Sequence, residues 1–101
     1  DRAPASIDAL PAIRNAVGER MTIMLDSGVR RGSDVVTALC LGADFVFAGR
    51  PTLYGVAADG QAGANKVLDI IRHEIDLVMA MIGCTAVDEL DERYVTRSPA
   101  I

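Results

Sequence analysis

Residues 23–34 read IMLDSGVRRGSD, and residues 45–51 read FVFAGRP. Each stretch is a short apolar run that ends in glycine and arginine, and each leads into a segment with helical periodicity. This is the layout of two consecutive strand–loop–helix units whose loops hold one phosphate group. In (β/α)8 barrels, such a site is often built from the loops after the seventh and eighth strands and a short extra helix. The two stretches therefore predict the phosphate-binding corner of a barrel.

A first helix is expected over residues 6–17, with Ser6 as its N-cap and Gly18 as its stop. Its apolar residues fall on one face: Leu10, Ile13 and Val17. Pro11 lies past the first turn, so it predicts either a bend or a start later than Ser6. Residues 21–25 follow as a run long enough for a buried parallel strand.

The second helix is expected to have Ser33 as its N-cap, Asp34 in its first turn and Gly42 at its end. Its inward-facing residues are expected to be Val35, Val36, Leu39 and Cys40. Residues 45–48 form the second predicted strand. Pro51 suits the first position of a short helix after it, where its missing N–H costs nothing.

Residues 59–63 are predicted to be a turn that leads into the longest helix, about residues 64–82, which Gly83 ends. One apolar stripe is expected along this helix: Leu68, Ile71, Ile75, Val78 and Ile82. Leu90 and Val95 are the anchors expected in the tail. The methionines are expected to fill the core or pack on helix faces: Met21, Met24, Met79 and Met81.

The order of elements is helix, strand, helix, strand, short helix and long helix, which predicts an α/β fold with a parallel sheet. Two strands cannot close a barrel, and a complete one takes about 250 residues. The chain is therefore either a fragment of a TIM barrel that contains the corner after about strands 7 and 8, or a chain whose remaining strands another chain supplies. Such a unit is incomplete on its own, and residues 96–101 are expected to be a frayed tail. The first residue is Asp rather than Met, which favours a piece of a longer chain.

Composition excludes several classes of function. The 101-residue chain has a formal net charge of −4, which provides no basic field for nucleic acid. No apolar run approaches the roughly 20 residues that span a bilayer, and the N-terminus does not resemble a signal peptide. The spacing of Cys40 and Cys84 suggests neither a disulfide framework nor a metal site, so we expect two buried, reduced thiols in a cytoplasmic protein.

The candidate site lies where the two predicted strands end, on the ligand side of a parallel sheet. Gly28 lets the backbone approach an anion closely, and the forked guanidinium of Arg30 suits phosphate oxygens. Gly49 and Arg50 repeat this arrangement one unit later, next to a helix N-terminus. Each motif alone is equally explained by a turn with a solvated arginine. Together they predict a phosphate site formed by Asp26, Ser27, Gly28, Val29, Arg30, Gly49 and Arg50.

The remaining polar residues offer no catalytic base. Arg31 is expected to lie at the surface or to pair with Asp34. His73, the only histidine, falls on the polar face of the last predicted helix and is expected to be solvated. That face also carries Lys66, Asp69 and Asp76. Neither a Ser/His/Asp nor a Cys/His arrangement is therefore available.

Four motifs in this order resemble the FMN-dependent 2-hydroxy acid dehydrogenases and oxidases. This family includes glycolate oxidase, flavin-linked L-lactate dehydrogenase and mandelate dehydrogenase. The motifs are DSGVRRGSD at 26–34, ALCLGAD at 38–44, GRP at 49–51 and GQAG at 60–63. The resemblance covers residues 1–95 and implies that they are the C-terminal part of an FMN-binding TIM barrel, about strands 7 and 8 with their flanking helices. Many members have a second glycine where this chain has Ser27.

The resemblance implies that the predicted phosphate site holds the ribityl-phosphate end of FMN. It also implies oxidation of a small-molecule L-2-hydroxy acid to the 2-oxo acid, with the flavin supplying the redox step. The family motif His-Gly-Gly-Arg-Gln-Leu-Asp would end at Asp1. The histidine that takes the substrate proton and the arginine that binds its carboxylate would then precede this chain, leaving it no catalytic residue. Family members are commonly tetramers, and some attach peripherally to the inner membrane through a segment outside this chain.

Two other interpretations fit the residues. One is another phosphate-binding barrel, similar to IMP dehydrogenase or isopentenyl diphosphate isomerase. The other is a non-catalytic half-barrel that assembles with a partner chain. A His-x-Gly-x-Arg segment encoded directly upstream would distinguish the 2-hydroxy acid family from both.

Overall fold

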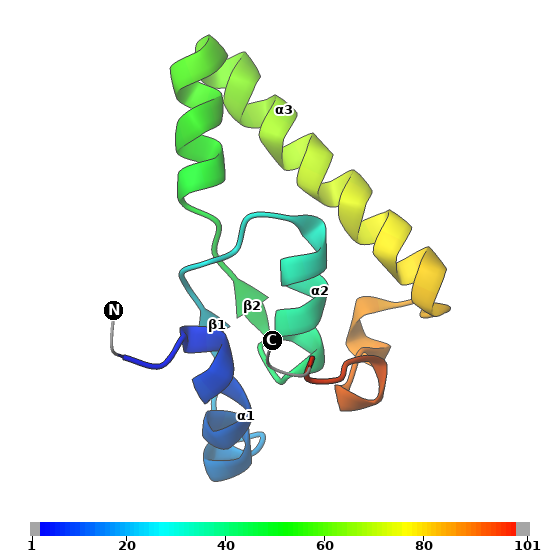
Figure 1. Cartoon of the computed structure of the whole chain (residues 1–101). Coiled ribbons are helices and arrows are strands. Elements are labelled where there is room, and N and C mark those ends of the chain that lie inside the picture. The colour runs from blue at the N-terminus through cyan, green and yellow to red at the C-terminus, as the bar shows by residue number, and fades with distance from the viewer. Residues whose placement is uncertain (1–2, 99–101) are drawn as a thin grey trace.

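The computed structural model of the chain describes residues 3–98 and arranges them as alternating helices and short strands (Figure 1). The elements are α1 (Ser6–Val17), β1 (Met24–Leu25), α2 (Gly32–Cys40), β2 (Phe45–Val46), α3 (Arg50–Ile82) and the 3-10 turns Val87–Glu89 and Glu92–Tyr94. None of the helices in this part of the chain has the length and apolar character needed to cross a membrane.

The two strands pair in parallel, as predicted, with Met24 opposite Phe45 and Leu25 opposite Val46. Both are shorter than the predicted 21–25 and 45–48, because each has only one neighbouring strand in the described residues. The pairing continues at the end of β2, where the Phe47 N–H donates to the Leu25 carbonyl at 2.9 Å. The carboxyl ends of β1 and β2 therefore lie side by side.

Helix α1 has the predicted bounds, but Ser6 is not its N-cap. Ala5 holds that position, and the Ser6 hydroxyl donates instead to the carbonyl of Asp26 at 3.0 Å. Pro11 lies inside the helix without delaying its start, so the expected later start was wrong. Proline removes only one hydrogen bond there, and the fully buried Leu10 holds the helix against the core.

Helix α2 begins two residues earlier than predicted, with Arg31 rather than Ser33 at the N-cap. The reason is the carboxylate of Asp34, which accepts the backbone N–H of Arg30 at 2.9 Å and that of Arg31 at 3.0 Å. These bonds satisfy donors just outside the first turn and shift the cap by two positions. The helix ends before Gly42, whose φ of 116° allows the chain to turn towards β2.

Helix α3 is two helical arms joined at a sharp kink, which Figure 1 shows as an inverted V. The non-helical backbone is confined to Asp59 and Gly60, so the predicted turn over 59–63 shrinks to two residues. Below the kink the arms nearly touch, because a Cβ on Gly55 would lie 2.6 Å from the Gly63 carbonyl oxygen. The longer arm then descends beside α2.

Two clusters of buried side chains hold these elements together. One joins α1, the strands and α2, and consists of Leu10, Ile23, Leu25, Val29, Ala38 and Ala43. The other joins α2, the long arm of α3 and the tail, and consists of Val36, Cys40, Met79, Cys84 and Leu90. Both cysteines are buried and free, and burial raises the pKa of the Cys40 thiol. Val95 packs against the second cluster, so both predicted tail anchors are confirmed.

Several residues predicted to be packed are exposed. Met79 alone of the four methionines is buried, whereas Met21, Met24 and Met81 are more than half exposed, at 60%, 58% and 78%. Ile13 and Leu68 also lie at the surface. Periodicity identifies the apolar face of an element but not whether a neighbour covers it. The interpretation of residues 96–101 as a frayed tail stays a prediction: Arg97 lies 3.3 Å from Asp8, and residues 99–101 lie outside the described residues.

Candidate functional site

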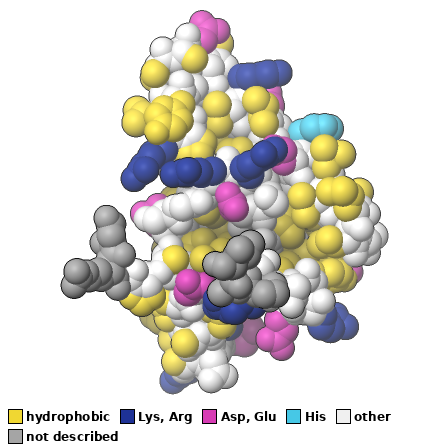
Figure 2. Space-filling view, in the orientation of Figure 1, with side chains coloured by type: hydrophobic (Ala, Val, Ile, Leu, Met, Phe, Trp, Pro, Cys, Tyr) yellow, Lys and Arg dark blue, Asp and Glu magenta, His cyan; other side chains and the backbone are white. Residues whose placement is uncertain are grey.

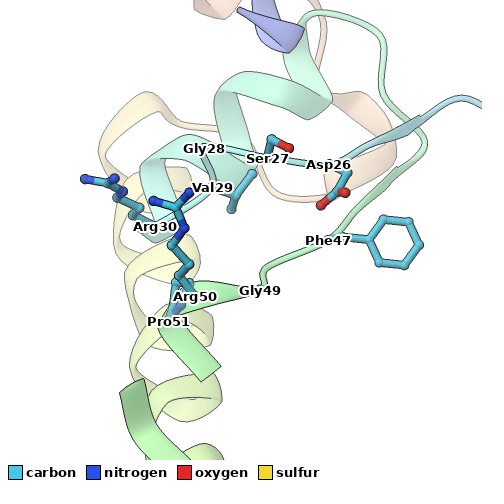
Figure 3. Close-up of a pocket in the computed structure, with 9 residues that line it drawn as sticks. All are labelled: Asp26, Ser27, Gly28, Val29, Arg30, Phe47, Gly49, Arg50 and Pro51. Carbon is cyan, nitrogen blue, oxygen red and sulfur yellow. The ribbon is translucent and has the colours of Figure 1, made fainter. Parts of the chain in front are cut away.

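A pocket of about 360 Å³ lies at the carboxyl ends of β1 and β2 (Figure 3). It is lined by Asp26, Ser27, Gly28, Val29, Arg30, Phe47, Gly49, Arg50 and Pro51. All seven predicted site residues are thus brought together around one cavity. Phe47 and Pro51 also line the cavity and were not among the predicted site residues, although both belong to the stretch at residues 45–51.

The loop after β1 bends through two residues with positive φ, Ser27 at 87° and Gly28 at 82°. Glycine adopts this region freely, but serine does so at a cost of about 1 kcal/mol or more. The loop is held in this shape from α1, because the Ser6 hydroxyl lies 3.0 Å from the Asp26 carbonyl and 3.5 Å from that of Ser27. Ser6 was predicted to be the N-cap of α1, so its contact with this loop was not expected.

The next part of the loop is fixed by Glu74 on the long arm of α3. Its Oε1 accepts the Gly32 N–H at 2.9 Å, and its Oε2 lies 2.5 Å from Nη2 of Arg31. Arg31 lies at the surface, as predicted, but the carboxylate with which it pairs is that of Glu74 rather than Asp34. The Arg31 guanidinium, and then the Gly32 N–H, lower the pKa of the Glu74 carboxyl. No local sequence pattern reveals this contact, because 43 residues separate Arg31 from Glu74.

The N-terminus of α3 faces the same pocket. Gly49 is the N-cap residue, so Arg50 takes the first helical position and Pro51 the second, one later than predicted. No side chain caps this end. The positive end of the helix dipole and its N–H groups are therefore available to an anion in the pocket.

Two guanidinium groups lie at one end of the pocket (Figure 3). Arg50 rises from the first turn of α3 towards the loop that carries Arg30, whereas Asp26 and Phe47 lie at the other end. Neither arginine forms an ion pair with another residue of the described part of the chain. Figure 2 shows a row of basic side chains across the upper half of the face in view. Two exposed cations beside a helix N-terminus make a site for a group with more than one negative charge.

His73 lies outside the pocket, exposed on the long arm of α3. Among the lining residues, Asp26 is the only carboxylate. No group of three His, Cys, Asp or Glu side chains within residues 3–98 is arranged to hold a metal ion. The pocket therefore has the chemistry of an anion-binding site rather than of a complete catalytic centre.

The model of a family described as FMN-dependent dehydrogenase matches residues 1–97. The chain belongs to this family. Membership settles the choice among phosphate-binding barrels that the sequence motifs left open. The seven residues predicted for the phosphate site all fall within the matched range.

Curated relatives cover almost all of the chain. It is 43% identical over 95 residues to an L-lactate oxidase of Nostoc sp. (strain PCC 7120 / SAG 25.82 / UTEX 2576), covering 94% of this chain and 26% of that protein. It is 47% identical to glycolate oxidase 3 of Arabidopsis thaliana, with the same coverage. Identity to 2-hydroxyacid oxidase 1 of Homo sapiens is 46%, over 98% of this chain and 27% of that protein. The chain thus spans about a quarter of the length of these relatives.

Solved structures agree on the fold. The monotopic membrane protein (S)-mandelate dehydrogenase superimposes with a TM-score of 0.91 at 40% identity, over 97% of this chain and 26% of that one. A flavocytochrome b2 variant with benzoylformate gives a TM-score of 0.86 at 38% identity, over 92% of this chain and 25% of that one. The chain therefore has the fold of part of the TIM barrel of these enzymes.

Proposed function

We propose that the chain forms about the seventh and eighth strand–helix units of an FMN-binding barrel and supplies its phosphate-binding corner. The observation that carries this proposal is the convergence of Arg30, Arg50 and the uncapped N-terminus of α3 on one pocket. In TIM barrels, the loops at this position and a helix N-terminus commonly bind phosphate.

The donors in the pocket fit the phosphate end of FMN. The two guanidiniums can neutralise a phosphate dianion, and the space beside Gly28 is open, because a Cβ there would meet no atom within 4 Å. The Asp26 carboxylate, at the other end of the pocket, can accept hydrogen bonds from ribityl hydroxyls. FMN held there would supply the redox chemistry of the reaction.

The substrate class follows from the relatives. Their names refer to lactate, glycolate and 2-hydroxyacids, and one solved neighbour is a mandelate dehydrogenase. We infer that the whole protein oxidises an L-2-hydroxy acid to the 2-oxo acid. This chain contributes cofactor binding, because neither the pocket nor His73 supplies a base for the substrate. The proton-accepting histidine and carboxylate-binding arginine would come from outside residues 1–101.

The test is an absorption spectrum of the full chain that the gene encodes, recorded before and after anaerobic addition of L-lactate, L-mandelate or glycolate. We expect a flavin spectrum that bleaches with one of the three acids. Chromatography of the released flavin should identify FMN rather than riboflavin. A purified, folded protein that neither contains nor takes up FMN would contradict the proposal.

A further inference from the structure

The N-terminus of α2 is already occupied by carboxylates of the chain itself. Oδ2 of Asp34 accepts the N–H groups of Arg30 and Arg31, at 2.9 and 3.0 Å. Oε1 of Glu74 accepts the next N–H, that of Gly32, at 2.9 Å. Three consecutive backbone donors at the start of this helix therefore point to acidic side chains rather than to the pocket.

Because of these bonds, the N-termini of α2 and α3 differ in whether their N–H groups are available to an anion. A helix N-terminus that follows a strand is an anion site when its N–H groups are available. At α2 those groups are bonded and two negative charges lie beside them, whereas no side chain caps α3. A phosphate in the pocket would therefore be bound by the start of α3 and repelled by the carboxylates at the start of α2.

The carboxylates also decide which way two successive arginines face. Arg31 has extended backbone, with φ −134° and ψ 163°, and neighbouring side chains on extended backbone point to opposite sides. Glu74 holds the Arg31 guanidinium outside the pocket, through Nε at 3.1 Å and Nη2 at 2.5 Å. Arg30 is then the residue that lines the pocket.

The backbone of the long arm of α3 packs closely against Gly32 in this loop. A Cβ on Gly32 would be 2.5 Å from both Cβ of Glu74 and the backbone nitrogen of Ile75. The position of Gly32 is thus set by backbone contact with α3 as well as by the Glu74 carboxylate. The loop is fixed before any ligand arrives.

We propose that Asp34 and Glu74 are positioning residues for the cofactor phosphate, acting by fixing the loop that places Arg30 in the pocket. This inference rests on the proposed function. It predicts a change in phosphate binding opposite to the change that simple electrostatics predicts. If the carboxylates only contributed charge, their removal would strengthen phosphate binding; if they position the loop, their removal weakens it.

The test compares FMN with riboflavin, which has the same ring and ribityl chain but no phosphate. The apoprotein of the full encoded chain is titrated with each flavin, and the ratio of the two dissociation constants measures the phosphate contribution. Asp34→Ala is expected to lower this preference for FMN about tenfold, the usual effect of losing charge-assisted hydrogen bonds. Asp34→Asn keeps an acceptor oxygen for the same N–H groups and should retain more of the preference.

Glu74→Gln provides a second, nearly isosteric variant in case Asp34→Ala does not fold. Its amide oxygen can still accept the Gly32 N–H, but the ion pair with Arg31 is lost. We expect a preference for FMN about threefold lower, since part of the restraint on the loop remains. Asp76→Ala, which removes an exposed carboxylate from the polar face of the same arm, is the matched control and should leave the preference unchanged.

The outcomes separate this inference from the proposed function. A preference that is unchanged or higher in both Asp34→Ala and Glu74→Gln, while Arg50→Ala lowers it, would overturn the positioning role and leave the phosphate site standing. A preference that Arg50→Ala and Arg30→Ala do not lower would instead show that the pocket does not bind the phosphate. A loss in the carboxylate variants alongside a loss in the arginine variants supports both.

Discussion

Nη2 of Arg14, on α1, lies 2.5 Å from Oδ2 of Asp44, immediately before β2. The same carboxylate oxygen accepts the backbone N–H of Ile23 at 2.9 Å, and Nε of Arg14 donates to the Gly42 carbonyl at 2.8 Å. These bonds tie α1 to the segments that lead into both strands. The Ile23 N–H, and then Arg14, lower the pKa of the Asp44 carboxyl.

The lowered pKa of Asp44 predicts a pH-dependent contribution to stability. The contribution is fully present above the ordinary aspartate pKa of about 3.9 and is lost as the pH falls through the lower pKa of the folded state. Asp44→Asn should lower the urea midpoint at pH 7 and reduce its further fall between pH 5 and pH 2. Glu19→Gln, at an exposed position nearby, is the control. Equal acid sensitivity of the Asp44 variant and the wild type would contradict this assignment.

Ser27 has the positive φ that glycine tolerates better. Ser27→Gly should therefore raise the free energy of unfolding by about 1 kcal/mol, because it relieves this backbone strain. The greater conformational entropy of glycine in the unfolded chain offsets part of this gain. Ser27→Val should lower it, because a β-branched residue is strained at this φ. Urea unfolding of the three proteins gives the order. If valine is tolerated as well as glycine, the loop does not have this backbone in solution.

The close contact below the α3 kink predicts that Gly55→Ala destabilises the protein. Alanine normally stabilises a helix by about 1 kcal/mol relative to glycine, but here its Cβ would meet the Gly63 backbone. We expect a net loss of about 1–3 kcal/mol, as for other overpacked sites. Ala57→Gly, on the same arm and exposed, measures the helix-propensity effect alone. A stabilised Gly55→Ala variant would mean that the arms do not approach in this way.

Arg50→Ala should weaken FMN binding about tenfold to a hundredfold, the range for losing a charge-assisted hydrogen bond of about 1.5–3 kcal/mol. Riboflavin binding should change little. Arg50→Lys should recover only part of the loss, because an ammonium group cannot bind two phosphate oxygens as a guanidinium does. Fluorescence titration of the apoprotein measures both flavins. Arg72→Ala, at an exposed position on α3, is the control for loss of positive charge.

His73 is exposed and lies away from the pocket, so His73→Gln should leave turnover of the whole protein unchanged. Steady-state kinetics with the 2-hydroxy acid that bleaches the flavin are the measurement. Because the substitution also leaves the core untouched, the thermal midpoint should not move. A large fall in kcat with a normal midpoint would assign His73 a chemical role.

The pocket could be predicted from the sequence because its residues come from two short, regular units. In a parallel sheet, the loops after adjacent strands necessarily meet at one edge, so the spacing of Arg30 and Arg50 was sufficient. The support behind the pocket could not be predicted in this way. The contact between Glu74 and the Arg31–Gly32 segment depends on how far the long arm descends, and the kink at Gly60 decides that.

The same limit explains the errors at the helix caps and in the core. Ser33 and Ser6 are residue types that favour N-caps. The Asp34 carboxylate, however, accepts the N–H groups before α2 and moves its cap to Arg31, and the Ser6 hydroxyl donates to the Asp26 carbonyl instead of capping α1. Met81 and Leu68 lie on helical turns with apolar neighbours, yet each remains exposed. Residue type and spacing indicate which residues can cap a helix or pack in a core. Which hydrogen-bond partner or neighbouring side chain each one meets depends on the tertiary arrangement.

Helix α3 contacts the loop after β1 from two directions. Arg50 begins one arm at the pocket, and Glu74 on the other arm anchors the back of the same loop. The kink at residues 59–60 therefore sets the distance between Arg50, at the start of the short arm, and Glu74, within the long arm. We expect substitutions at this distant kink, or a single-residue insertion in either arm, to change that distance and with it the cofactor affinity proposed for the pocket, while every pocket residue stays the same.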